Sequence, residues 1–434
     1  MPRTKRNLLT AMRKGADPLT WNPLDNAAKI FPPTSHGADS GVFRLSAELN
    51  ETVDPSRLQQ ALDQTLQRFP HMQMVLRRGL FWYYLEQSTL HPQVTVEHAP
   101  LCAPLYHGSR SLLFEISYWR SKINLELYHV LADGSGAMEF FRALIIRYLI
   151  LSHPEIEIED EPISPAYARG EDSFRRYYQK GAKNYNIKPP RAHHIRGPLR
   201  SEGGLSAIEG VAPVKKVLEA AHRYQATLTV YLCAVLAQAI YQEMYLSDRS
   251  RPVVLTVPVN LRGFFPSDSG RNFFGTFPVS YDFSGSEMSF EEIVRLTARA
   301  FEETLTEERV SRRMNQLAAL EHQPFIRAIP LFLKNPVMRL AGWMSDRSET
   351  AVLSNVGRFE LPEPLQPFLK GVGLFMSTHA LQLCTISSGA FIHFGFTSAF
   401  SRPAIQRRFF TRLIEDGIDI EIRSSEHHLE ESHA

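Results

Sequence analysis

His129, Asp133 and Gly134 form an H-x-x-x-D-G pattern at a corner of the chain where chemistry is possible. An imidazole has a reference pKa of about 6.5, so its neutral form is available at cellular pH to take a proton from a hydroxyl or an amine. A packing role is the alternative, because a single histidine is more often structural than catalytic. The surrounding residues must decide between the two.

The predicted strand and helix on either side of this pattern favour a functional role for His129. Residues 122–129 have the character of a strand, and apolar residues recur at helical spacing from Ala137 to Tyr148. Asp133 or Ser135 is the expected N-cap of that helix. His129 therefore lies where a strand passes into a helix, which is a common place for functional side chains.

The rest of the first half mixes strands and helices. Residues 42–50 alternate apolar and polar types, as a half-buried strand does, and Asp54 before Pro55 predicts a helix start. A hairpin is expected to turn near Gly79, and two further strands to join near Arg120.

The second half follows a similar plan. Residues 228–241 predict a buried helix, residues 251–262 a strand covered on both faces, and Ser289 with Glu292 a capping box. Several short strands follow before a last helix. The expected fold class is therefore α+β, with mixed sheets in both halves.

The length of 434 residues predicts two domains, because it exceeds what one compact core usually holds. Residues 162–204 are rich in proline, glycine and charge, which indicates a crossing between them. The expected organisation is a flexible basic N-terminus (1–20), an N-terminal subdomain (21–185), a crossing linker (186–204), a C-terminal subdomain (205–423) and a disordered tail (424–434).

Composition excludes several classes of partner. The 48 basic and 46 acidic residues give a net charge of +2, so there is no electrostatic case for nucleic acid or an anionic membrane. The longest apolar stretch, residues 228–241, is shorter than the roughly 18 residues that suggest a transmembrane segment. Cys102, Cys233 and Cys384 are widely spaced, which predicts free thiols in a reducing cytoplasm. The segment "RTKRNLLTAMRKGAD" lacks an uninterrupted apolar region, so no signal peptide is expected.

Other catalytic chemistry has little support. His193 and His194 are adjacent rather than four residues apart on a helix, and no H-E-x-x-H pattern occurs, so no metal site is expected. The residues around Ser135 lack the G-x-S-x-G spacing of a nucleophile elbow.

The H-x-x-x-D-G pattern and four segments together resemble the CoA-dependent acyltransferase superfamily. This superfamily includes chloramphenicol acetyltransferase, alcohol acetyltransferases, polyketide-associated acyltransferases and peptide-synthetase condensation domains. The segments are "DPSRLQQALDQTLQRFPHMQMVLRRG", "TLTVYLCAVLAQAIYQEM", "VPVNLRGFFPSDSGRNFFGTF" and "SNVG". The resemblance implies two similar mixed-sheet domains in a V, with a channel between them.

The resemblance also implies roles for individual residues. His129 would be the general base, acyl-CoA (acetyl-CoA) the cosubstrate, and a small alcohol or amine the acceptor, with no covalent acyl-enzyme and no permanently bound cofactor. Asp133 would pair with an arginine, for which Arg262 is the candidate, and Gly134 would leave room at the corner. A plain helix cap remains the alternative for Asp133.

Ser354 and Asn355 are expected to help bind substrate. The Asn355 amide can donate to the donor or the oxyanion, although Asn-x-Gly is also ordinary turn chemistry. Asn272 is expected to have a structural role.

Two departures from the superfamily pattern narrow the expected kind of enzyme. Tyr128 stands where many condensation domains carry a second histidine, which favours a free-standing enzyme close to alcohol acetyltransferases and polyketide-associated acyltransferases. The late D-F-G-W-G motif of the plant members is missing. A condensation-type enzyme with a carrier-protein-bound acyl donor, and a non-catalytic binding protein of the same fold, remain the alternatives. No sequence feature indicates an oligomeric state.

Overall fold

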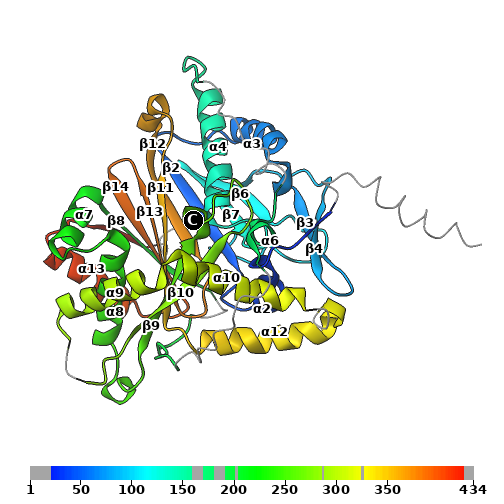
Figure 1. The fold of residues 1–434 in the computed structure, drawn as a ribbon. Coiled ribbons are helices and arrows are strands. Elements are labelled where there is room, and N and C mark those ends of the chain that lie inside the picture. The colour runs from blue at the N-terminus through cyan, green and yellow to red at the C-terminus, as the bar shows by residue number, and fades with distance from the viewer. Residues whose placement is uncertain are drawn as a thin grey trace, which may run out of the picture.

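The computed structural model describes residues 21–158, 170–179, 191–200, 204–285, 288–323 and 327–424 (Figure 1). The predicted N-terminal segment 1–20 lies outside these residues. So do residues 186–190 and 201–203 of the predicted linker, and residues 425–434 of the predicted tail.

Three sheets organise the described part of the chain. Their strand orders are β10-β9-β11-β13-β14-β8-β15, β12-β2-β7-β6-β5 and β1-β4-β3. The strands are β1 (Trp21–Pro23), β2 (Val42–Leu49), β3 (Met74–Arg78), β4 (Tyr83–Gln87), β5 (Thr95–Val96), β6 (Phe114–Trp119), β7 (Lys122–Tyr128), β8 (Ser206–Pro213), β9 (Val253–Asn260), β10 (Phe274–Tyr281), β11 (Ala351–Phe359), β12 (Leu369–Met376), β13 (Leu381–Ser388), β14 (Phe391–Ser398) and β15 (Glu421–Ser424).

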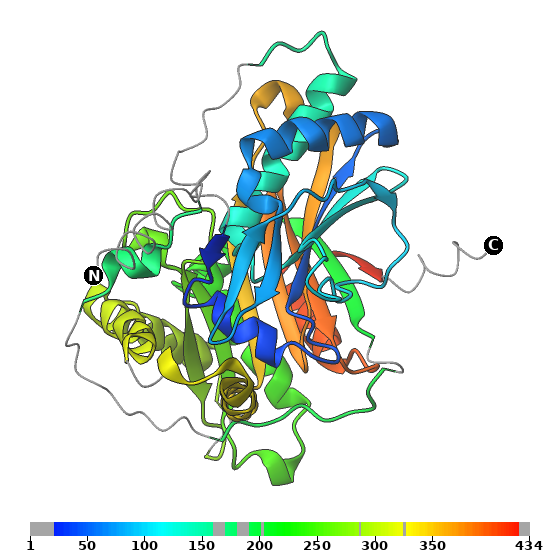
Figure 2. The same ribbon diagram turned by 90° about the vertical axis from the view of Figure 1, so that its right-hand side faces the viewer.

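Helices accompany both larger sheets, and the predicted α+β class is confirmed (Figures 1 and 2). They are α2 (Phe31–Thr34), α3 (Pro55–Arg68), α4 (Gly134–Ser152), α6 (Ser173–Tyr177), α7 (Val214–Arg223), α8 (Leu228–Gln242), α9 (Phe290–Thr304), α10 (Glu307–His322), α12 (Leu331–Asp346) and α13 (Ala404–Glu415).

Local sequence signals set several of these boundaries. The Asp54 carboxylate accepts hydrogen bonds from the backbone N–H groups of Ser56 and Arg57, so α3 begins where the Asp-Pro pair predicted. Ser289 and Glu292 form the predicted capping box at the start of α9. The apolar residues of α8 are buried in the core of the C-terminal half, as expected.

One strand of the second half belongs to the sheet of the first half. β12 lies within the range 205–423, yet it pairs with β2 in antiparallel fashion. Where β12 crosses β14, a Cβ atom on Gly395 would lie 2.0 Å from the carbonyl oxygen of Leu374. Only glycine permits so close an approach of the two backbones. Gly395 therefore allows the two larger sheets to pack closely where β12 crosses β14.

The three cysteines are free, as predicted, and all three are buried. Burial raises the pKa of each of the three thiols, because a thiolate would lose its hydration.

Among the described residues, no single helix is both long enough and apolar enough to cross a bilayer. Only α7 and α8 taken together, bent by 80° at their junction, reach that length and composition.

Candidate active site

His129 directly follows β7, and an aromatic enclosure surrounds its ring. Its backbone N–H donates to the carbonyl of Gly41 at 2.9 Å. The Phe31 ring stacks on the imidazole with 4.7 Å between centroids, and the rings of Phe43 and Phe274 each lie 5.2 Å away. These phenylalanines come from α2, β2 and β10, so both halves of the chain build the enclosure.

Asn272 fixes which nitrogen of His129 carries the proton. Its amide nitrogen donates to the backbone carbonyl of His129 at 3.0 Å and to the carboxylate of Asp25 at 3.2 Å. Its amide oxygen therefore faces His129 Nδ1, at 2.9 Å, and must accept from that nitrogen. The neutral ring is thus held with the proton on Nδ1 and a lone pair on Nε2.

The same surroundings keep this imidazole neutral. Burial lowers the pKa of His129, while the Asp133 carboxylate and the Asn272 amide oppose the shift only in part. The residue is 8% exposed, and Nε2 makes no hydrogen bond to another residue of the described part of the chain. Nε2 is therefore the one ring nitrogen left to accept a proton from a bound acceptor.

Asp133 carries out both of the roles considered for it. One carboxylate oxygen caps α4 by accepting from the Gly136 N–H at 2.9 Å. The other accepts from Arg262 Nη1 at 2.7 Å and from the Phe273 N–H at 2.8 Å. The structure thus brings the predicted pair Asp133 and Arg262 together across 129 positions of sequence.

Arg262 uses its second amino group to hold the loop that carries Asn272. Its Nη2 donates to the backbone carbonyls of Ser269 at 2.8 Å and Arg271 at 2.7 Å. Arg262 binds the backbone of Arg271, and Asp133 binds the backbone of Phe273. The ion pair therefore fixes the chain on both sides of Asn272. The ion pair positions the ring of His129 through Asn272, and the Asp133 charge also raises the pKa of the imidazole.

Asp25 is a further buried member of this network that the sequence analysis did not single out. It is fully buried, and its carboxylate accepts from the Ala28 N–H at 2.7 Å and from Asn272. Arg271 Nε lies 3.5 Å from the same carboxylate. Burial raises the pKa of Asp25 to about 6, although Arg271 opposes the shift. A local signal existed, because Asp three residues before Ala28 matches capping spacing.

The tightest glycine at the corner is not the one in the motif. A Cβ atom on Gly134 would lie 3.2 Å from Cγ1 of Val356, a contact that a small shift of that side chain relieves. A Cβ atom on Gly136 would lie 1.9 Å from the carbonyl oxygen of Gly270. Gly136 therefore permits the close approach of α4 to the loop 269–273.

Ser354 and Asn355 lie on β11, next to the start of α4. The Asn355 amide nitrogen donates to Thr229 Oγ1 at 3.0 Å, and its oxygen accepts from the Gly357 N–H at 3.1 Å. The strand is irregular here, and Gly357 has a φ of 90°. Asn355 thus shapes this bend, and its contact with substrate stays a prediction.

Tyr128 is the last residue of β7 and has contacts of its own. Its hydroxyl lies 3.2 Å from Ser35 Oγ, and its ring stacks with Tyr106. Burial raises the pKa of this phenol. No group of three histidine, cysteine or acidic side chains is placed to hold a metal ion in the part of the chain that the structure describes.

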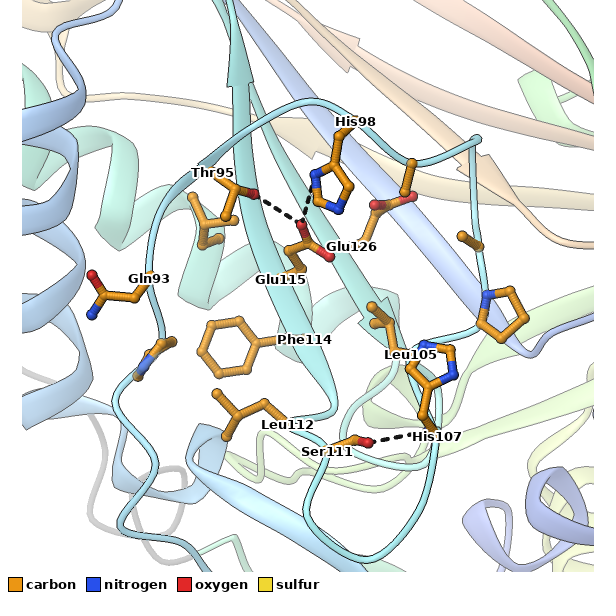
Figure 3. A pocket seen from close by; sticks show the side chains of 15 residues that line it. Gln93, Thr95, His98, Leu105, His107, Ser111, Leu112, Phe114, Glu115 and Glu126 are labelled. Atoms are coloured by element: carbon orange, nitrogen blue, oxygen red, sulfur yellow. Dashed lines mark hydrogen bonds and ion pairs between the residues drawn. The ribbon is translucent and has the colours of Figure 1, made fainter.

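A cavity of about 400 Å³ lies beneath the segment 92–112, on the Tyr128 side of the N-terminal sheet (Figure 3). Figure 3 shows Thr95 and His98 directed at Glu115, with Phe114 and Leu112 forming an apolar wall. His129 does not line this cavity. The predicted channel beside His129 therefore stays a prediction.

No protein-family model and no curated protein sequence matches the chain. Several solved structures do match the chain. Polyketide synthase associated protein 5 from Mycobacterium tuberculosis matches with a TM-score of 0.61 and 13% identity, over 92% of this chain and 98% of that one. The starter condensation domain of rhizomide synthetase, solved with an acyl-CoA and Leu-SNAC, matches with a TM-score of 0.59 and 15% identity, over 93% and 95%.

The chain has the condensation-domain fold. TRI101 of F. graminearum, solved with coenzyme A and T-2 mycotoxin, also matches, with a TM-score of 0.60 and 12% identity, over 89% of this chain and 96% of that one. Because these matches span both halves, the condensation-domain fold accounts for the whole arrangement of two mixed-sheet bodies in a V. The resemblance inferred from the sequence is confirmed at the level of the fold.

Proposed function

We propose that this protein is an acyltransferase that moves an acyl group from acyl-CoA to the hydroxyl or amine of a small acceptor, with His129 as general base. One observation carries the proposal. Asn272 holds the proton of His129 on Nδ1 and leaves the lone pair of Nε2 unused. A buried neutral imidazole so oriented is suited to proton transfer.

The chemistry needs no covalent enzyme intermediate. Nε2 takes the proton of the acceptor as its oxygen or nitrogen attacks the thioester carbonyl. The C–S bond then breaks, and the imidazolium returns the proton to the departing coenzyme A thiolate. The imidazolium gains stabilisation from the Asp133 carboxylate, which raises the pKa of His129 against the effect of burial.

Acyl-CoA, and acetyl-CoA in particular, is the donor we favour. Two of the matching structures hold coenzyme A or an acyl-CoA, which supports a CoA thioester. Tyr128 in place of a second histidine favours a free-standing alcohol acetyltransferase-like enzyme. Free buried cysteines suit a reducing compartment, and we place the enzyme in the cytoplasm.

A carrier-protein-bound donor is the second candidate, because condensation domains are prominent among the matching structures. In either case we assign Asp133, Gly134 and Arg262 to the support of the site. We assign Ser354 and Asn355 to the binding of substrate.

A donor and acceptor screen tests the proposal. The purified protein is offered acetyl-CoA, longer acyl-CoA thioesters or an acyl-carrier protein, together with alcohols and amines, while free thiol is measured. We expect turnover with acetyl-CoA that is lost in His129→Ala. Turnover should be kept in the control variant His98→Ala, because the His98 side chain is 64% exposed and lines the separate cavity of Figure 3.

The outcomes separate the alternatives. Turnover only with an acyl-carrier protein supports the carrier-dependent candidate. No turnover with any donor, or full turnover in a folded His129→Ala variant, rejects the catalytic assignment and leaves a non-catalytic binding protein. Circular dichroism and melting temperature establish that each variant is folded.

A further inference from the structure

Helix α12 turns its apolar side to solvent. Of its residues, only Leu331, Lys334 and Gly342 are buried. Large apolar side chains with 53% to 67% of their surface exposed are Phe332, Leu333, Val337, Leu340, Trp343 and Met344. Their spacing places them along one stripe of the helix. Contiguous exposed apolar surface of this kind marks an interaction site.

Polar contacts fix the helix in this orientation. Lys334 Nζ donates to the carbonyl of Phe81 at 3.0 Å and lies 3.5 Å from the centre of the Trp82 ring. Asn335 Nδ2 donates to the Tyr83 hydroxyl at 3.0 Å. Arg339 Nε donates to the carbonyl of Pro33, also at 3.0 Å. The polar side of α12 therefore holds it against the protein, and the six side chains of the apolar stripe stay more than half exposed.

The apolar surface continues onto the β3–β4 hairpin. The Leu331 N–H donates to the Leu80 carbonyl at 2.8 Å, which joins the start of α12 to the tip of the hairpin. Leu80 and Phe81 are both exposed at that tip. The hairpin tip therefore lies against the start of α12 and adds two exposed apolar side chains near the stripe.

Cations predominate among the exposed charges on and around α12. Within residues 327–347, the exposed charged residues are Arg327, Arg339 and Arg347 and one acid, Asp346. The Arg347 guanidinium lies 4.5 Å from the centre of the Trp343 ring, so an aromatic ring and a cation are paired at the end of the helix. Tryptophan and arginine in this combination are typical of the level of lipid headgroups.

The chain ahead of β1 adds charge of the same sign. Residues 1–20 contain five basic residues and one acidic residue, which are Arg3, Lys5, Arg6, Arg13, Lys14 and Asp17. This segment leads into Trp21 in β1, and β1 pairs with β4, the strand that leaves the exposed hairpin tip. The described chain therefore begins at Trp21, opposite Glu86 at the end of β4 farther from the hairpin tip.

We infer that α12 and the β3–β4 hairpin tip dock on the surface of a lipid bilayer that contains anionic headgroups. The apolar stripe enters the interface, and the flanking arginines meet phosphate groups. Neither the whole-chain charge of +2 nor the lack of a single spanning helix in the described residues opposes this, because local charge and an apolar edge suffice for a surface helix. The inference does not depend on the acyltransferase proposal.

Vesicle flotation with the full chain tests it. Vesicles of phosphatidylcholine alone and of phosphatidylcholine with phosphatidylglycerol are floated through a density gradient with the protein. We expect the protein to float with the anionic vesicles, and the Val337→Glu/Leu340→Glu variant to lose at least ten-fold in bound fraction. Leu246→Glu is the matched control, because Leu246 is 79% exposed in the short helix Leu246–Asp248.

A second readout follows Trp343 itself. A blue shift of tryptophan emission on adding anionic vesicles, absent in Trp343→Phe, supports the inference. It is overturned if the wild-type chain stays unbound with anionic vesicles, or if the double variant floats like wild type. Sedimentation of a wild-type dimer that the double variant dissociates, with no vesicle binding, overturns it in favour of a second copy of the chain.

Discussion

Asn272 contacts His129 at two points, with its amide oxygen 2.9 Å from ring Nδ1 and its amide nitrogen 3.0 Å from the backbone carbonyl. The two residues are 143 positions apart. One side chain thereby sets both the tautomer and the position of the imidazole, and it comes from the other half of the chain.

Replacing Asn272 tests this arrangement. Asn272→Leu removes the acceptor from Nδ1, so the ring loses its fixed tautomer, and kcat is expected to fall about 100-fold, within the range typical of general-base catalysis. KM for the acyl donor is expected to change little. Steady-state kinetics of this variant and of Asn50→Ala, whose side chain caps a distant backbone carbonyl, provide the comparison. Equal loss in both variants contradicts the assignment.

The pH dependence of the rate follows from burial of His129. Because burial lowers the pKa of this imidazole, its neutral form persists below the ordinary titration range. The acidic limb of kcat/KM is therefore expected to have its midpoint below pH 6.5. A profile of kcat/KM from pH 4.5 to 8 measures it, and a midpoint at or above 6.5 refutes this expectation.

Asp25 predicts a change of stability with pH. Its pKa is about 6 in the folded protein against an ordinary value of 3.8, so the folded state holds a proton that the unfolded chain has released between these values. The free energy of unfolding therefore falls as pH rises from about 4 to about 6, by up to about 3 kcal/mol from this group. Urea unfolding at pH 4, 5, 6 and 7 measures it. Asp25→Asn should lack this contribution, and identical slopes in both proteins would exclude it.

Asp133→Asn tests the ion pair with Arg262. Both side chains are largely buried, so removing the negative charge leaves a guanidinium without its counter-ion, and we expect a loss of about 3 kcal/mol in unfolding free energy. The rate should fall as well, since the loop carrying Asn272 is held by this pair. Glu360→Gln disrupts the exposed pair with Arg358 and should cost less than about 1 kcal/mol. A lower rate at unchanged melting temperature speaks against a structural role for Asp133.

The two glycines at the corner should differ. Gly136→Ala places a methyl group 1.9 Å from a backbone oxygen, so the loop 269–273 must move, and we expect both the melting temperature and the rate to drop sharply. Gly134→Ala meets only the end of Val356 at 3.2 Å and should lower both by much less. Thermal melts and initial rates of the two variants decide between them. The reverse order would contradict the geometry.

The parts that local sequence determines could be predicted. The cap at Asp54, the capping box of α9 and the buried helix α8 follow from neighbouring residues, and the structure contains each of them. The contact between Asp133 and Arg262 was expected only because a resemblance supplied it. Nothing local to either residue indicates the other.

The rest depends on contacts between distant segments. Asn272 lies in "RNFFG", where only a structural role was expected. Its contact with His129 forms only when the residue after β7 and the loop before β10 come together in the folded chain. Helix α12 has apolar residues on most of its length and Pro336 inside it, so periodicity did not indicate an element there. β12 could not be assigned to its sheet, because its partner β2 lies more than three hundred positions earlier.

The pairing of β12 with β2 also bears on how the chain folds during synthesis. A ribosome that has synthesised only the first half has produced four strands of this five-stranded sheet, β2, β7, β6 and β5, and the β12 edge is still missing. That edge is completed only after residue 376 has emerged. Separate expression of the two halves should therefore yield an N-terminal fragment with an open, aggregation-prone β2, rescued by supplying the C-terminal fragment in the same cell.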